Sequence, residues 1–259
     1  MRRHWRMRWA WAAHDAWTAG QPARSYPPAP VRITMAIFGV AILWGWDRTA
    51  LAILLTWAAA LRPGETCALT VGDLHTGDQS GFVVLQEPKT KHRSARRQYV
   101  RLWEPQLLAV LARLVHGAPP EASVCGQSVS TLRDRMASIT RRLELPTGQY
   151  VGFTPASFRS GRATQLYEFW EAQGLPAAEL ARRLLRHDKV QTTDRYVQEV
   201  VAATLRLPAK SEERIRAVLA ALPQLFDAWL ARLGASTPGP ARPRGLGLAP
   251  LVLDADDSD

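Results

Sequence analysis

The apolar run over residues 33–61 constrains the fold more than any other part of this 259-residue chain. A membrane-spanning helix needs about 20 consecutive apolar residues. Asp47 and Arg48 divide the run into apolar pieces of 14 and 13 residues, and both pieces are shorter than that. We therefore expect two helices that are buried in a folded core and joined by a polar turn at Asp47 and Arg48, rather than a transmembrane hairpin.

The charge balance indicates the class of partner. The chain has 33 Lys and Arg against 23 Asp and Glu, which gives a net charge of +10. Such a charge favours a polyanionic partner, with nucleic acid ahead of an anionic membrane surface. The two cysteines, Cys67 and Cys125, are too few for a disulfide framework or a four-cysteine zinc site. The N-terminus lacks the pattern of a signal peptide, so we expect an intracellular protein that is located with DNA.

Composition divides the chain into four segments. Residues 1–30 hold four tryptophans and five arginines and end in a Pro-rich linker, so they are a candidate remnant of a preceding domain. Residues 31–207 are expected to form the main domain. Residues 208–233 are expected to form a C-terminal amphipathic helix, kinked near Pro223. Residues 234–259 are rich in Gly and Pro, end in an acidic run, and are predicted to be disordered.

The remaining periodicity predicts a mainly α fold with a small antiparallel β-sheet or hairpin, in the α+β class. Two β-rich stretches, residues 80–87 and 97–102, are predicted to pair as a hairpin. Apolar spacing of the helical type predicts further helices over residues 104–116, 130–143, 157–173 and 177–186, and one that begins near Thr192 and Thr193.

Candidate functional residues are basic side chains and one tyrosine that are spread along the chain. They are Arg62, Lys89, Arg159, His187 and Tyr196. Arg62 precedes Pro63, a residue that suits the first turn of a helix, so Arg62 is expected at a helix junction. The sequence has no glycine-rich phosphate loop and no HExxH or GxSxG motif, and we expect neither a cofactor nor a metal.

Three segments that carry these residues resemble the catalytic domain of the tyrosine recombinases, the phage-integrase family. LRPGETCALTVGDL is similar to the family's first arginine box, TPASFRSGRAT to the second, and RHDKVQTTDRY to the box that joins a histidine to the nucleophilic tyrosine nine residues later. The resemblance covers about residues 31–205. It implies the DNA breaking-rejoining fold, with Arg62, Lys89, Arg159, His187 and Tyr196 as the catalytic residues.

The chemistry of phosphodiester cleavage agrees with this set. Two guanidiniums, on Arg62 and Arg159, would stabilise the charge that in-line attack adds to the non-bridging oxygens. Tyr196 would attack to form a 3′-phosphotyrosyl link, and a lysine on the hairpin would protonate the leaving 5′-oxygen. Lys89 fits the family pattern, but Lys91 lies two residues on and would face the same side of a strand. His187 would donate a hydrogen bond to a non-bridging oxygen.

Three departures from the family pattern are visible. Ala156 stands where the family has the histidine of its His-x-x-Arg motif, and Arg186 stands where it has the glycine before the second histidine. The first departure affects proton transfer and predicts an impaired site. The family's N-terminal core-binding domain is absent or reduced to residues 1–30, which predicts weak recognition of a DNA sequence by this chain alone.

The interpretation is therefore a site-specific recombinase or integrase of a mobile genetic element, with double-stranded DNA as its partner. Alternatives are a type IB topoisomerase, a decayed recombinase that only binds DNA, and, more distantly, a membrane-surface protein. Helix 211–233 is expected to dock on a neighbouring protomer, so that a homo-oligomer assembles on DNA. Other expected phosphate contacts are Lys91, Arg93, Arg96, Arg97 and Arg186.

Overall fold

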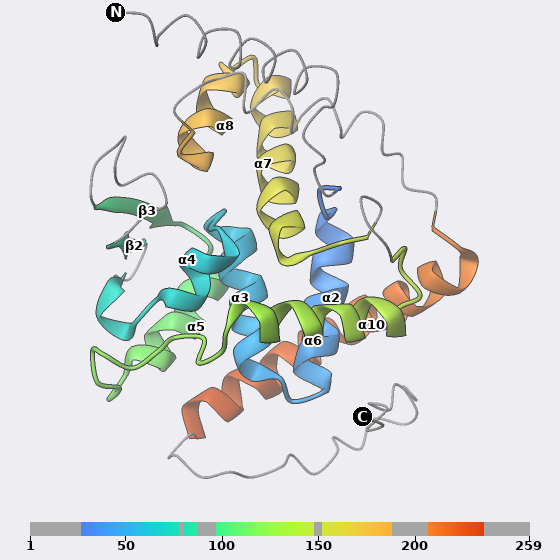
Figure 1. The fold of residues 1–259 in the computed structure, drawn as a ribbon, viewed down its shortest axis with the longest axis horizontal. Helices are drawn as coiled ribbons and strands as arrows, with labels where there is room; N and C mark the ends of the chain where they lie inside the picture. Colours follow the sequence, from blue (N-terminus) through green and yellow to red (C-terminus); the bar gives the residue numbers. More distant parts are fainter. Residues whose placement is uncertain (1–26, 78–79, 87–96, 148–151, 188–206, 236–259) are drawn as a thin grey trace, which may run out of the picture.

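The protein is described from a computed structural model that covers residues 27–77, 80–86, 97–147, 152–187 and 207–235. Its helices surround a central apolar pair, and a small sheet lies at one side of the helical body (Figure 1). The elements, in chain order, are α2 (Val31–Leu43), α3 (Asp47–Ala58), α4 (Pro63–Ala68), the 3-10 turn η1 (Val71–Asp73), β1 (Leu74–Thr76), β2 (Gly81–Leu85), β3 (Gln98–Leu102), α5 (Pro105–Val115), α6 (Val129–Arg142), α7 (Pro155–Ala172), α8 (Ala177–Leu185) and α10 (Ala209–Ala235).

The two central helices, α2 and α3, are the pair expected from the apolar run. Most of their side chains are buried, which is why both helices are apolar on nearly every face. The turn between them lies two residues earlier than predicted. Gly45 turns the chain with a φ of 70°, a conformation that costs glycine little. Asp47 instead begins α3, where its carboxylate faces the positive end of the helix and pairs with Arg232 at 2.7 Å.

The small sheet has the order β1-β2-β3, with both pairs antiparallel. The predicted hairpin is confirmed as β2 and β3, in a register that places Val83 opposite Val100. The short strand β1 was not expected, and its Leu74 lies opposite Val83. These three side chains are buried, so one face of the sheet packs on the core. The other face is directed away from it, as side chains alternate along each strand.

The C-terminal helix α10 packs along α2 of its own chain. Val218, Leu225 and Trp229 are buried there, and the Trp229 ring meets Phe38 edge-on at 5.4 Å between centroids. Gly39 is the point of close approach, since a Cβ at this position would lie 2.7 Å from a methyl group of Val218.

The sequence analysis expected the stripe of α10 to dock on a neighbouring protomer, whereas in this structure α2 of the same chain contacts it. The stripe is covered within one chain, because α2 has no polar face and needs a partner along its length. The helix also continues through Pro223 from Ala209 to Ala235.

The other predicted helices are confirmed, with bounds that differ by two residues or fewer. They are α5, α6, α7 and α8. The helix expected near Thr192 and Thr193, and most of segments 1–30 and 234–259, lie outside the described residues. Within the part of the chain that is described, no helix has the length and apolar character to cross a membrane.

Candidate active site

The first arginine box forms a tight turn between α3 and α4. Arg62 is the N-cap residue of α4 and has an extended backbone, and Pro63 occupies the first helical position, as the sequence predicted. Glu65, three residues on, accepts a hydrogen bond from the Arg62 backbone N–H at 2.8 Å and one from its guanidinium at 2.6 Å. The carboxylate thus caps the helix and fixes the direction of the Arg62 side chain.

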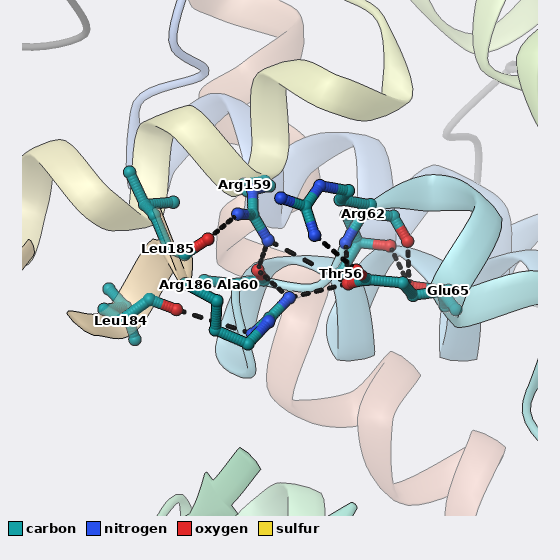
Figure 2. Close-up of polar contacts among 9 residues, drawn as sticks. Thr56, Ala60, Arg62, Glu65, Arg159, Leu184, Leu185 and Arg186 are labelled. Carbon is teal, nitrogen blue, oxygen red and sulfur yellow. Dashed lines mark hydrogen bonds and ion pairs between the residues drawn. The ribbon is translucent and has the colours of Figure 1, made fainter. Parts of the chain in front are cut away.

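The second arginine comes from the first turns of α7. The Arg159 side chain is almost fully buried and donates to the backbone carbonyl of Ala60 and to that of Leu185 at the end of α8. Its Nη1 also lies 4.0 Å from the Glu65 carboxylate. Arg159 therefore joins three segments that are far apart in the sequence: the end of α3, the start of α7 and the end of α8 (Figure 2).

Two residues next to this arginine have left-handed backbones without being glycine. Ala60 has a φ of 46° and Arg186 a φ of 54°. This conformation costs an L-residue about 1–2 kcal/mol, so the surrounding contacts must hold it in place. At Ala60 the contacts are those of its carbonyl oxygen, which accepts hydrogen bonds from both Arg159 and Arg186.

Arg186 stands at the C-cap of α8, and its side chain crosses to the first arginine box. Its Nη2 lies 2.6 Å from Glu65 Oε2, and only about a tenth of the side chain is exposed. Figure 2 shows the guanidiniums of Arg62, Arg159 and Arg186 gathered around this one carboxylate. The four charged groups sum to +2, so the cluster has an excess of positive charge.

Glu65 stays ionised in this cluster. Burial raises the pKa of its carboxyl, but Arg186, the N–H groups of Arg62 and the more distant Arg159 together outweigh burial, and the pKa lies below its ordinary value. Burial lowers the pKa of Arg186 against the attraction of Glu65, and Arg62 lowers it further. An arginine keeps its charge after such a shift, because its ordinary pKa is far above neutral.

His187 follows Arg186 directly and is half-buried. Its backbone N–H donates to the carbonyl of Arg182 at 3.0 Å, and its own carbonyl accepts from the Arg182 guanidinium at 2.9 Å. The residue is therefore held at the end of α8, next in the chain to the side chain that binds Glu65.

The structure brings together Arg62, Arg159 and the segment of Arg186 and His187. Arg97 is exposed at the edge of the hairpin. Ala156 is exposed in the first turn of α7, and its methyl side chain can act neither as an acid nor as a base. The other predicted residues lie outside the described part of the chain, and their positions stay predictions: Lys89, Lys91, Arg93, Arg96 and Tyr196.

Glu65 and the backbone carbonyls of Ala60 and Leu185 were not among the predicted site residues. The spacing of Arg62 and Glu65 in a Pro-containing helix start was a usable signal, because an acid at the third helical position commonly caps the helix. Backbone carbonyls leave no such signal. Within the described residues, no group of three or more His, Cys, Asp and Glu side chains is placed to hold a metal ion.

The arrangement can bind an anion between segments that meet only in the folded chain. Arg62 is the most exposed of the three guanidiniums, with 23% of its side chain accessible, and its Nη1 is paired with Glu65. A phosphate would meet this guanidinium first. Arg159 lies deeper, and its hydrogen bonds hold the backbone at both sides of the site.

The chain is similar to known proteins both in its sequence pattern and in its fold. A model of the phage integrase family matches residues 46–202. A solved structure of the XerH site-specific recombinase, bound to a palindromic difH substrate after cleavage, is similar in fold, with a TM-score of 0.50 at 15% identity over 71% of this chain. A pre-cleavage XerH complex with difH gives 0.49 at 15% identity over 72% of this chain. The chain spans about half the length of these proteins, 55% of each. Comparison with curated proteins finds no match.

Proposed function

This chain belongs to the phage integrase family, and we propose on that basis that it is a site-specific DNA recombinase, an integrase of a mobile genetic element. Double-stranded DNA would be its substrate, in agreement with the net charge of +10. The XerH structures that resemble it were solved with difH DNA.

The proposed reaction is an exchange of one phosphoester bond for another. The Tyr196 hydroxyl gives its proton to water and its oxygen attacks the scissile phosphorus, so that a bond forms between them and the bond to the 5′-oxygen breaks. Lys89 gives its proton to the departing 5′-oxygen, so that a free 5′-hydroxyl and a 3′-phosphotyrosyl link result. Attack by a 5′-hydroxyl of another strand reverses these steps and rejoins the DNA.

The observation that carries the proposal is the convergence of two arginines from distant boxes. Arg62 and Arg159 are 97 positions apart, yet both lie against Glu65, at 2.6 and 4.0 Å. Paired guanidiniums are suited to the non-bridging oxygens of a phosphodiester, whose charge grows during attack. The half-buried His187 follows the Arg186 that binds the same carboxylate.

Exchange between two duplexes needs at least two cutting protomers, so we propose a homo-oligomer on DNA. An exchange of residues 211–233 between protomers would have to separate α10 from α2, where Val218 and Trp229 are fully buried. The helix expected around Tyr196 lies outside the described residues.

A nicked suicide substrate tests the proposal. Cleavage next to the nick releases a short fragment, which removes the 5′-hydroxyl needed for rejoining and traps the covalent complex on a denaturing gel. Since the target sequence is unknown, the substrate would be a pool with a degenerate site. Wild-type protein should form the adduct and Tyr196→Phe should not, with DNA binding retained. An adduct in the Phe variant would assign the nucleophile to another residue.

Ala156 favours one alternative, a protein that binds DNA without cutting it. The family's histidine is replaced by a residue without a titratable group, and Ala156 is exposed at the start of α7. In this case wild-type protein would bind the pool and leave no adduct. Ala156→His should then restore adduct formation if this residue alone accounts for the loss.

A further inference from the structure

The outer face of the sheet carries an unusual group of exposed aromatic side chains. Of the large apolar side chains that are exposed in the described residues, three belong to this face: Phe82, Tyr99 and Trp103. Tyr99 is 65% exposed and Trp103 59%. Burial of such rings in water-free contacts is favourable, so a cluster of them in solvent indicates a surface that has a partner.

The strand register places these rings side by side. His75 lies opposite Phe82, and their rings stack with centroids 4.4 Å apart and planes 16° from parallel. Phe82 lies opposite Arg101 on the third strand and also meets the Tyr99 ring at 5.9 Å. The Arg101 guanidinium covers the Trp103 ring at 3.7 Å from its centroid. We call His75, Phe82, Tyr99, Arg101 and Trp103 the aromatic sheet face.

The charge of this face is positive. Arg101 is exposed, and Arg97, the residue before β3, is exposed as well. The nearest carboxylate in the sequence, Glu104, is already paired with Arg162, which lies over Trp57 on the core side. Aromatic rings interleaved with arginines are the surface that unpaired nucleic-acid bases bind, because rings stack on bases and guanidiniums attract the phosphates between them.

We propose that the aromatic sheet face binds single-stranded DNA, with unpaired bases stacked on Tyr99 and Trp103. Paired bases in a duplex hide their flat faces from such rings, so duplex DNA would gain little from this surface. The choice of DNA rests on the proposed function, since a strand that has been cut must leave its complement before it joins another strand. The stacking geometry itself does not depend on that function.

Binding of an oligothymidylate of about 12 nucleotides, followed by fluorescence anisotropy, tests the proposal. Tyr99→Ala with Trp103→Ala should weaken binding by about tenfold for each ring removed. The affinity for a duplex of the same length should change by less than about twofold, because its bases are already stacked. Trp103→Phe keeps a ring and should retain most of the affinity.

The chain offers a matched control in Phe169 and Leu175. They are the other large apolar side chains that are exposed in the described residues, and they lie on and just after α7. Phe169→Ala with Leu175→Ala should leave oligonucleotide binding unchanged. An equal loss of oligonucleotide affinity in both double variants, or no loss in the variant with Tyr99→Ala and Trp103→Ala, would overturn the proposal. A variant that loses self-association but keeps its affinity for the oligonucleotide would overturn it too.

A measurement on unaltered protein keeps the proposal testable if the double variant fails to fold. An oligonucleotide that contains 5-iodouracil forms crosslinks with aromatic side chains on irradiation, and peptide mapping locates them. Crosslinks at Tyr99 or Trp103 are expected, and crosslinks only elsewhere would contradict the proposal. The suicide-substrate assay separates the two ideas: adducts without this binding overturn the sheet site alone, and this binding without adducts overturns the recombinase function alone.

Discussion

Arg186 Nη2 lies 2.6 Å from Glu65 Oε2, in a buried ion pair that joins the end of α8 to the first arginine box. The residue that makes this contact has a left-handed backbone, with φ at 54° and ψ at 44°. A glycine would adopt that backbone more readily, but it would leave Glu65 without its nearest partner on α8. The ion pair therefore offsets the cost of an arginine at this position.

Arg186→Gly is expected to destabilise the protein despite the relaxed backbone. The substitution recovers about 1–2 kcal/mol of backbone strain. Removal of one partner from a buried ion pair costs up to about 3–5 kcal/mol, but Glu65 keeps its contact with Arg62, so a net loss of about 1–2 kcal/mol is expected. Urea unfolding measures it. Arg186→Asn is the variant to compare with it, because asparagine also adopts the left-handed backbone readily and also lacks the ion pair with Glu65. Arg183→Gly would not serve as a control, because glycine destabilises the interior of a helix. Greater stability of both Arg186 variants would show that the pair contributes nothing.

Glu65 should make stability depend on pH in the acidic range. Its folded-state pKa lies below the ordinary value of 4.5, so the ionised carboxylate stabilises the fold above that pH. This contribution is lost as the pH falls through the folded-state pKa. Glu65→Gln should therefore be less stable than wild type at neutral pH, and the difference should shrink in acid.

Unfolding by urea at several pH values between about 7 and 3 would measure this difference. Glu213→Gln, at an exposed position of α10, is the control and should follow the wild-type curve. A wild-type and Glu65→Gln difference that is constant over the whole range would contradict the assignment.

Much of the fold could be predicted because its signals are local. The break in the apolar run, the proline after Arg62 and the alternation in the hairpin each determine a nearby backbone conformation, and α3, α4, β2 and β3 follow. The strand β1 has only three residues, too few for a period to be visible. The position of the α2–α3 turn depended on Gly45, whose preference for a positive φ outweighed the polarity of the residues that follow it.

The site was predictable only in part, because its contacts join distant segments. The boxes identified Arg62 and Arg159, but the hydrogen bonds of Arg159 to two backbone carbonyls depend on where α3 and α8 end in space. The apolar stripe of α10 showed that the helix needs a partner. A stripe cannot show whether that partner is in the same chain, and here it is α2.

Arg159→Lys tests whether the planar guanidinium is needed as well as the charge. A lysine cannot donate to the Ala60 and Leu185 carbonyls in the forked geometry that an arginine provides. Adduct formation with the suicide substrate should fall by about 100- to 1000-fold, measured as the single-turnover rate of the folded fraction. Arg183→Lys, on the exposed side of α8, should cleave at the wild-type rate. An Arg159→Lys variant with full activity would show that Arg159 does not hold the scissile phosphate.

Salt should weaken the binding of duplex DNA steeply. Each phosphate neutralised by a lysine or arginine releases a counterion, so 6–10 contacts would lower affinity by about 10³–10⁵ between about 50 and 200 mM salt. Arg96→Ala with Arg97→Ala should reduce the slope of log affinity against log salt by about two, if both side chains contact phosphates. Titration at several salt concentrations gives the slope, and a slope that the double variant leaves unchanged would remove both from the interface.

Trp229 tests whether α10 belongs to the core of its own chain. Its ring is fully buried against Phe38 and Phe226. Trp229→Ala should cost about 3–5 kcal/mol in the free energy of unfolding. Trp229→Phe should cost less, because it keeps a ring and removes an indole N–H that is buried without a hydrogen-bond partner.

Truncation after Leu207 should unfold or aggregate the protein for the same reason, since it exposes the apolar surface of α2. A truncated chain that stays folded and monomeric would instead show that the fold does not need α10. Docking of α10 on a neighbouring protomer would then be the better explanation of the apolar stripe of α10.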